Sequence, residues 1–227
     1  MFSDPDWSWL CIGPNLFWVA KVVHIKLATF WAMLPESKNG LGFTLQELKL
    51  VYSITPIAVT LCMLILHILS RDTSKENSAA RQRRNWKTIL CTSVINFGSS
   101  LIYIVVICLP SRAFTIGFLV FKETLMLTSV SMNFLVANEE ASETVPKAIY
   151  SCFLSAGNIV YSFGAGFGVL LVQTGFSYLL NSKVIADLFG SLQPLVAFSP
   201  LVALFAYAMV CEFKHYYRNV KQHLNNA

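Results

Sequence analysis

Residues 17–34, FWVAKVVHIKLATFWAML, decide the fold class of this chain. With a few flanking residues, the stretch is long and apolar enough to cross a bilayer as one α-helix, which takes about 20 mainly apolar residues. Near its middle, however, it carries Lys21, His24 and Lys26. A charged side chain at that depth costs on the order of 3 kcal/mol on insertion scales, and such residues usually face a cavity or a partner. The rest of the chain must supply that partner.

The composition of the whole chain is that of an integral membrane protein. Of its 227 residues, 55% are hydrophobic and only 13% are charged. The mean hydropathy is +0.57. A soluble domain carries about 25% charged residues, which cover its surface. This chain lacks that polar surface, so we expect the lipid bilayer to cover much of it.

Six stretches are long and apolar enough to be membrane-spanning helices. They cover about residues 14–34, 50–69, 88–109, 114–137, 147–172 and 187–211. Polar and apolar residues do not alternate within them, which favours helices over strands. We therefore predict one all-α membrane domain over residues 1–227, with a basic cytoplasmic loop at 70–87 and a cytoplasmic tail at 212–227.

The basic residues indicate how the chain is oriented. Six of the 17 lysine and arginine residues lie in the 71–87 loop, and cytoplasmic loops carry an excess of such residues. Placing this loop in the cytosol also puts the 138–147 loop and both termini there. Ten basic residues are then cytosolic and four lie on the other side, with three inside spans. A nucleic-acid site is the other interpretation of a basic cluster, but the flanking spans favour the cytoplasmic loop.

Few residues suit metal or enzyme chemistry. The six cysteines are scattered without a C-x-x-C pair or a histidine at zinc spacing. Phosphate-binding, zinc-hydrolase and nucleophile-elbow motifs are also missing from the sequence. We therefore expect no metal, no cofactor and no enzymatic activity.

Three segments carry a resemblance to a known family. The hairpin FWAMLPESKNGLGFTLQELKLVYSITPI, residues 30–57, has a turn at Gly40 and Gly42 and a helix start at Thr44 with Glu47 three residues on. It resembles the seventh-to-eighth helix hairpin of the major facilitator superfamily, especially its zinc-induced-facilitator-like branch. The stretches EASETVPKAIYSCFLSAGNIVYSFGAGFGVLL and DWSWL resemble the entries to helices eleven and seven of the same family.

The resemblance covers nearly the whole chain and places its six spans over helices seven to twelve. It implies the C-terminal six-helix half of a major facilitator fold, built from two inverted three-helix repeats. It also implies a transporter that moves a small solute by alternating access, with or without proton coupling. A second six-helix half, from a homodimer or another chain, would complete the site. The alternative is a non-transporting membrane subunit, or a truncated transporter paralogue, that acts through a partner chain.

Ionisable and amide side chains near the middle of the spans are the candidate site. Lys21 and His24 share a helix face, whereas Lys26 points well away from His24. We hypothesise that Lys26 or Lys21 pairs with Glu123 and that either His24 or Glu123 carries the titrating group. Structural charges that pair internally are the alternative. We also expect His24, Lys122 and Asn158 to line a polar cavity. The candidate substrate or proton pathway comprises Lys21, His24, Lys26, Lys122, Glu123 and Asn158.

The fifth span carries glycines on one helix face. Gly157, Gly164 and Gly168 recur at spacings of seven and four, and the last two form a G-x-x-x-G pattern. Small residues let another helix approach closely, which is a main route to tight packing in lipid. We expect packing within the chain here rather than a dimer interface.

Overall fold

The computed structural model describes residues 5–70, 78–106 and 111–225. Every regular element in these ranges is helical. The long helices are α1 (Pro5–Met33), α2 (Leu45–Ser70), α3 (Ser78–Val106), α4 (Arg112–Thr144), α5 (Lys147–Leu171) and α8 (Gln193–Asn225). The short elements are η1 (Glu36–Lys38), the π-helical η3 (Val172–Phe176), α6 (Ser177–Asn181), α7 (Lys183–Phe189) and η4 (Gly190–Leu192).

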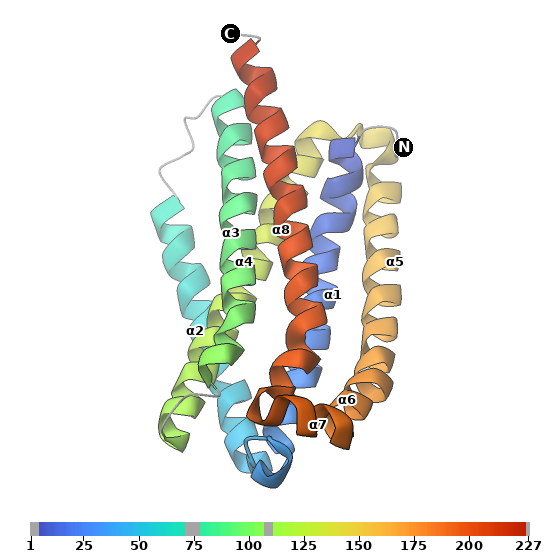
Figure 1. The fold of residues 1–227 in the computed structure, drawn as a ribbon. Helices are drawn as coiled ribbons and strands as arrows, with labels where there is room; N and C mark the ends of the chain where they lie inside the picture. The colour runs from blue at the N-terminus through green and yellow to red at the C-terminus, as the bar shows by residue number, and fades with distance from the viewer. Residues whose placement is uncertain (1–4, 71–77, 107–110, 226–227) are drawn as a thin grey trace.

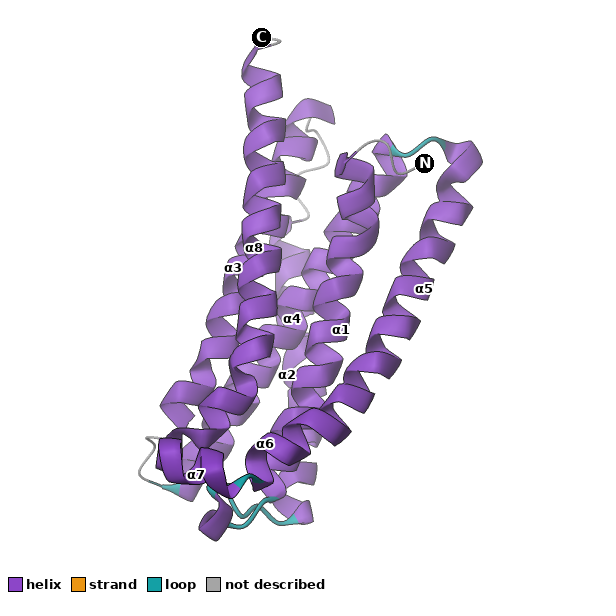
Figure 2. Ribbon diagram, turned by 45° about the vertical axis from the view of Figure 1, so that its right-hand side comes forward, coloured by secondary structure: helices purple, strands orange, loops and turns teal. Residues whose placement is uncertain are grey.

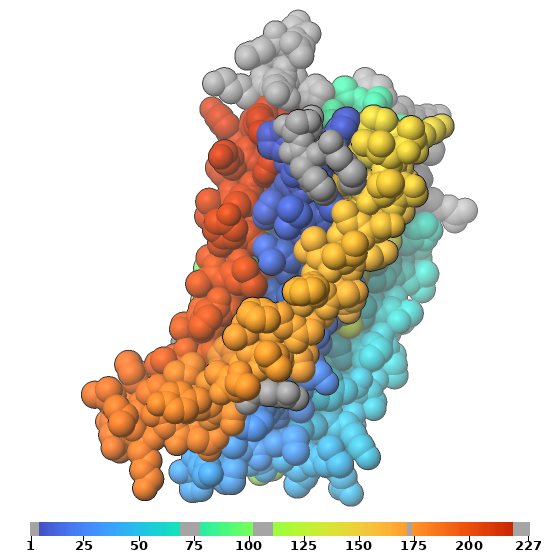
Figure 3. Space-filling model, turned by 90° about the vertical axis from the view of Figure 1, so that its right-hand side faces the viewer, coloured from blue at the N-terminus to red at the C-terminus, as the bar shows by residue number. Residues whose placement is uncertain are grey.

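The long helices form a bundle around α1 and α4 (Figure 1). α1 packs against α4, α5 and α8, and α4 packs against α1, α2 and α3. α3 also packs against α8. α5 lies along the outer side of α1 (Figure 2), and Figure 3 shows it crossing α1 between α8 and α2. Among the long helices, α1 and α4 pack against the most other long helices, and these two carry the predicted ionisable residues.

Five described helical segments are long and apolar enough to cross a membrane. They are Pro5–Met33, Leu45–Ile68, Arg112–Thr144, Lys147–Asn181 and Lys183–Asn219. The prediction of an all-α chain with several membrane-length helices is thereby confirmed. α3 contains the predicted third span, 88–109, as far as Val106, and residues 107–110 lie outside the described residues. The sixth crossing stays a prediction.

Several helices extend beyond the ends predicted for them. The predicted loop at 70–87 is wrong from Ser78 onward, because α3 begins there. α4 continues to Thr144 through the predicted 138–147 loop, and the predicted tail continues α8 as far as Asn225. Hydropathy marks the lipid-facing part of a helix, whereas Glu, Gln, Lys and Arg are good helix formers in water. Charged turns therefore extend these helices past their apolar parts.

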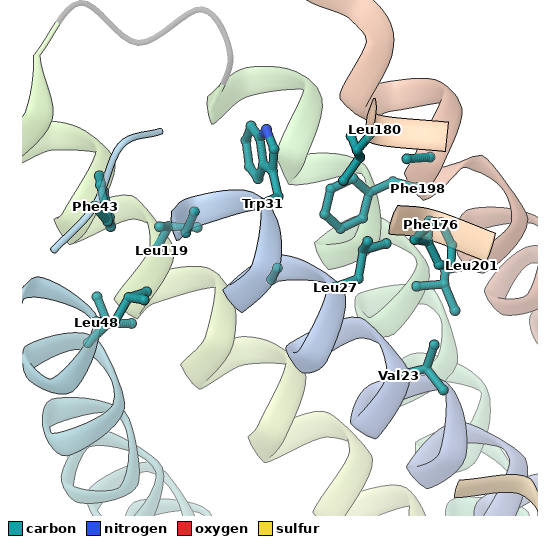
Figure 4. Packing of buried hydrophobic residues seen from close by; sticks show 14 of the residues in the cluster. Val23, Leu27, Trp31, Phe43, Leu48, Leu119, Phe176, Leu180, Phe198 and Leu201 are labelled. Carbon is teal, nitrogen blue, oxygen red and sulfur yellow. The ribbon is translucent and has the colours of Figure 1, made fainter. Parts of the chain in front are cut away.

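An aromatic core closes the end of the bundle opposite the chain termini. Trp31 of α1 is 1% exposed and lies between Phe43 and Leu119 on one side and Leu180 and Phe198 on the other (Figure 4). Its indole Nε1 donates to the carbonyl of Asn39 at 2.8 Å. Burying an aromatic ring that also satisfies its N–H favours one fixed arrangement of these helices.

The α1–α2 hairpin has the predicted turn and cap. Gly42 adopts a φ of +61°, and a Cβ on Gly40 would collide with the backbone of Leu34. The Thr44 amide donates to Glu47 Oε2 at 2.7 Å, and the Glu47 amide donates to Thr44 Oγ1 at 3.3 Å. This reciprocal pair is a capping box, and it confirms the predicted start of the helix.

Each end of the bundle has ion pairs between residues that are far apart in the sequence. Arg112 at the start of α4 donates to both Glu47 carboxylate oxygens, at 2.6 and 2.8 Å. At the other end, Asp6 contacts His215 at 2.5 Å and also binds Arg218. The beginning of α1 and the end of α8 therefore lie at the same end of the bundle (Figure 1).

Candidate functional site

Four ionisable residues meet where α1 packs against α4. Lys21 and His24 come from α1, and Lys122 and Glu123 come from α4; we call these four residues the charged cluster. Their exposed fractions are 3%, 1%, 0% and 5% in that order. Lys and Glu are almost never this buried unless they are paired. The centre of the bundle is therefore polar, although most of the helix surface around it is apolar.

Lys122 is the hub of the charged cluster. Its Nζ lies 2.6 Å from Glu123 Oε1 and 2.5 Å from His24 Nε2. When Lys122 is a charged ammonium group it can only donate, so this contact then requires an unprotonated Nε2 on His24. The rings of Phe198 and Phe205 stand edge-on to His24, with centroids 5.8 and 6.3 Å away. These apolar walls strengthen the polar contacts that they enclose.

Lys21 is held differently from Lys122. Its Nζ lies 5.4 Å from the centroid of the Trp18 ring, which is cation–π distance. In the described part of the chain, the ion pair of Glu123 is made with Lys122. The charged cluster therefore contains two lysines and one carboxylate, and the second lysine, Lys21, contacts an aromatic ring.

The predicted pairing of the charged cluster is wrong in part. Glu123 pairs with its neighbour Lys122, and the predicted partner Lys26 is exposed on another face of α1. Lys26 lies two residues from His24, so the two side chains point about 200° apart around the helix. Adjacent helix residues do not normally face each other. The long, flexible Lys122 side chain overcomes that divergence.

A small cavity of about 10 Å³ lies beside Glu123. Trp31 of α1 and Tyr52 of α2 are among the residues that line it. The Tyr52 hydroxyl contacts the hydroxyl of Thr29. A cavity of this size is at the lower limit for holding one water molecule. Glu123 is thus a member of the charged cluster that lies next to free space.

Asn158 lies apart from the charged cluster, which corrects the prediction that both line one cavity. It is exposed on α5 and lines a separate cavity of about 270 Å³. Asn15 and Trp18 of α1, Phe134 of α4 and Tyr161 of α5 line the same cavity. The Trp18 indole lines this cavity and also contacts Lys21, so it lies between the cavity and the charged cluster.

A second set of buried polar residues joins α3, α4 and α8; we call it the polar ladder. Ser129 donates to Asn96 Oδ1 at 2.6 Å. One turn further along α4, Asn133 Nδ2 donates to Thr92 Oγ1 and to Glu212 Oε1, both at 3.2 Å. The five residues are buried. Hydrogen bonds between membrane helices stabilise their packing, so the polar ladder fixes α3 and α8 on α4.

Glu212 is one of the buried residues that sequence reasoning missed. The predicted sixth span ends at residue 211, which placed Glu212 in the cytoplasmic tail. In the structure it is 0% exposed on α8, on the same face as Phe205 and Ala208. The spacing of three and four between these residues is helical and continues past the apolar span. That periodicity was the signal available in the sequence.

The α5 glycines lie against α1. A Cβ on Gly157 would lie 2.8 Å from Asn15 Nδ2, and a Cβ on Gly164 would lie 2.8 Å from Val19 Cγ2. A Cβ on Gly168 would collide with Val23. The glycine face of α5 therefore occupies the interface with α1, where each glycine makes room for an α1 side chain.

The described residues include no group of three or more His, Cys, Asp or Glu side chains that could hold a metal ion. Comparison with protein-family models, with curated proteins and with solved structures finds no match to this chain.

Proposed function

We propose that this chain is a membrane carrier of the major facilitator type, corresponding to one six-helix half, which moves a small solute by alternating access. The observation that carries the proposal is the charged cluster. A charged side chain at the centre of a membrane helix costs about 3 kcal/mol on insertion scales. A cluster with two lysines and a glutamate is therefore an expensive feature, and ionisable residues inside a membrane commonly mark substrate or proton pathways.

The way the helices pack supports an inverted-repeat architecture. If α1, α2 and α3 exchange places with α4, α5 and α8, the principal packing pairs are unchanged. The α1–α5 pair becomes α4–α2, and the α1–α8 pair becomes α4–α3. The α1–α4 and α3–α8 pairs map onto themselves. Transporters built from inverted three-helix repeats place their sites near the membrane midplane, where equivalent helices meet.

The charge balance favours a solute that carries negative charge. Lys122 is already paired with Glu123, so Lys21 holds the excess positive charge beside Trp18. An anionic group of the solute at this position would neutralise the charge of Lys21, which lipid tails cannot do. In the absence of solute, proton release from the charged cluster would serve the same purpose, and His24 and Glu123 are the groups that would pass the proton on.

The proposal includes six crossings with both termini in the cytosol, because the basic residues concentrate at the end where α3 begins and α8 ends. A second six-helix half would cover the cavity at Asn15 and Asn158, which lies between α1, α4 and α5. The same open cavity is what favours the second candidate function. In that case the chain is a non-transporting subunit whose α1–α5 face holds a partner chain.

Uptake into proteoliposomes tests the proposal. Purified protein is reconstituted and offered radiolabelled small carboxylates, with neutral and cationic solutes of similar size as comparisons, under an imposed proton gradient. We expect uptake of at least one carboxylate, and we expect Glu123→Gln and His24→Ala to remove most of it. The control is Lys26→Gln, because Lys26 is exposed. Uptake that is unchanged in Glu123→Gln and His24→Ala would reject this role for the charged cluster.

The assembly mass separates the two candidates. A homodimer, or a complex with a second six-helix chain in a lipid nanodisc, would restore the twelve-helix count and support the carrier. A complex with a stable partner that shows no uptake of any solute would support the subunit instead.

A further inference from the structure

A larger groove lies between α2, α3 and α4, away from the charged cluster. Its volume is about 520 Å³, and none of the four cluster residues lines it. Most of its wall is apolar, with Ile65 from α2, Cys91 and Ile95 from α3 and Met132 from α4. Small-molecule sites have volumes of about 300–1,000 Å³. The groove is therefore large enough for an extended hydrocarbon chain.

One end of this groove is basic. Lys87 lines the groove and is exposed. Arg83 lies one turn earlier on the same face of α3 and is also exposed. Arg81 differs from both, because its guanidinium is paired with Glu143 at 2.9 Å. Two cations thus stand where the charged first turns of α3 meet its apolar part, and Cys91 and Ile95 continue the same helix face into the groove.

The surface around the groove is apolar. Ile57, Leu61, Leu64 and Ile68 of α2 are all exposed. In a membrane, lipid tails cover such a surface, so the groove opens toward lipid rather than toward water. A soluble anion could neutralise Lys87 and Arg83, but it would leave the apolar wall unfilled. An amphiphile with a hydrocarbon chain and an anionic head matches both parts of the groove.

We propose that this groove binds an anionic glycerophospholipid of the surrounding bilayer. One acyl chain lies along Cys91 and Ile95, and the phosphate of the headgroup lies at Lys87 and Arg83. Basic residues at the membrane surface attract anionic lipids, and arginine binds phosphate through paired N–H donors. This proposal does not depend on the transport function, because it uses a different face of α4 and different residues.

Lipid retention in native mass spectrometry tests the headgroup. The full chain is reconstituted in nanodiscs of equal parts phosphatidylglycerol and phosphatidylcholine, extracted in mild detergent, and the retained lipids are quantified. We expect retained phosphatidylglycerol to exceed phosphatidylcholine. Each basic residue is worth about fivefold, so the Arg83→Gln/Lys87→Gln variant should lose about 25-fold of this preference. The control is Lys147→Gln, an exposed lysine at the start of α5.

Filling the groove tests the acyl chain. Ile65→Trp and Cys91→Trp place an indole in the groove from opposite walls, and either should reduce retention of both lipids while the melting temperature is kept. Equal retention of the two lipids by the wild-type chain would overturn the proposal. So would a loss of preference in Lys147→Gln as large as in the double variant, which would indicate diffuse charge only. Displacement of the lipid by inorganic phosphate alone would point to a soluble anion site instead.

Discussion

The charged cluster and the polar ladder are both buried on α4, yet they are built from different chemistry. In the polar ladder, amide and hydroxyl donors meet acceptors on other helices, as in Asn133 with Glu212 and Ser129 with Asn96. In the charged cluster, two lysines accompany one carboxylate, and the ion pair of Glu123 with Lys122 lies within α4 itself. The cluster reaches across helices through the contact of Lys122 with His24 of α1. The polar ladder thus joins three helices by hydrogen bonds, whereas the charged cluster joins two helices around one buried ion pair. We expect the polar ladder chiefly to hold helices in place, and the charged cluster chiefly to bind or titrate.

Removing the carboxylate from the charged cluster should have the largest effect on stability. In Glu123→Leu, the Lys122 ammonium is left buried without its ion-pair partner. Breaking a buried pair on one side costs about 3–5 kcal/mol. We expect a loss of that order in the free energy of unfolding, measured by denaturant titration in detergent micelles.

The matched control removes both charges. Lys122→Met/Glu123→Leu replaces the pair with apolar side chains, and such replacements are often neutral. It should recover most of the stability and still fail to transport. A double variant as unstable as Glu123→Leu would show that the charged cluster is structural, which would erase the contrast with the polar ladder.

Breaking the polar ladder should cost less and spare transport. Asn133→Leu removes the donor to Glu212 and Thr92. Hydrogen bonds between membrane helices are worth about 0.6 kcal/mol on average, with a maximum near 1.7. We therefore expect a loss of about 1–2 kcal/mol in the same titration. Leu135→Asn, at an exposed position of α4, is the comparison for a polar change outside the polar ladder.

Transport would distinguish the two regions more sharply than stability does. Uptake by Asn133→Leu, corrected for the amount of folded protein, should match the wild-type chain. If uptake were lost as completely as in Glu123→Gln, the polar ladder would belong to the transport pathway as well.

The helix centres were predictable from the sequence, and several of the helix ends were not. Hydropathy finds the segments that lipid covers, and all the described long helices contain a predicted span or most of one. It cannot find where a helix stops in water, because residues such as Arg83 and Glu139 continue a helix well. The α2 start was predicted correctly because Thr44 and Glu47 carry a cap signal of their own.

Membership of the charged cluster was easier to predict than its pairing. Lys21, His24, Lys122 and Glu123 were selected because each lies near the middle of its predicted span. The structure places these four residues together. Depth says nothing of rotation around the helix, so it also selected Asn158, which lies elsewhere. Pairing between neighbours depends on side-chain flexibility, which spacing rules do not describe.

The α1–α5 interface has the smallest expected effect, and it provides a reference for both polar regions. The two helices of this interface pack closely through complementary shapes. Gly164 makes room for Val19, and a Cβ on Gly164 would lie 2.8 Å from Val19 Cγ2. Gly164→Ala should therefore destabilise the bundle by about 1 kcal/mol, since overpacking costs about 1–3 and one methyl group is the mildest case. Gly166→Ala is the matched control, because no atom lies within 4 Å of its Cβ position. Val19→Ala should rescue Gly164→Ala by restoring the space. If both glycine variants behaved alike, α5 would not depend on close approach to α1, and the charged cluster would have to help hold α1 in place after all.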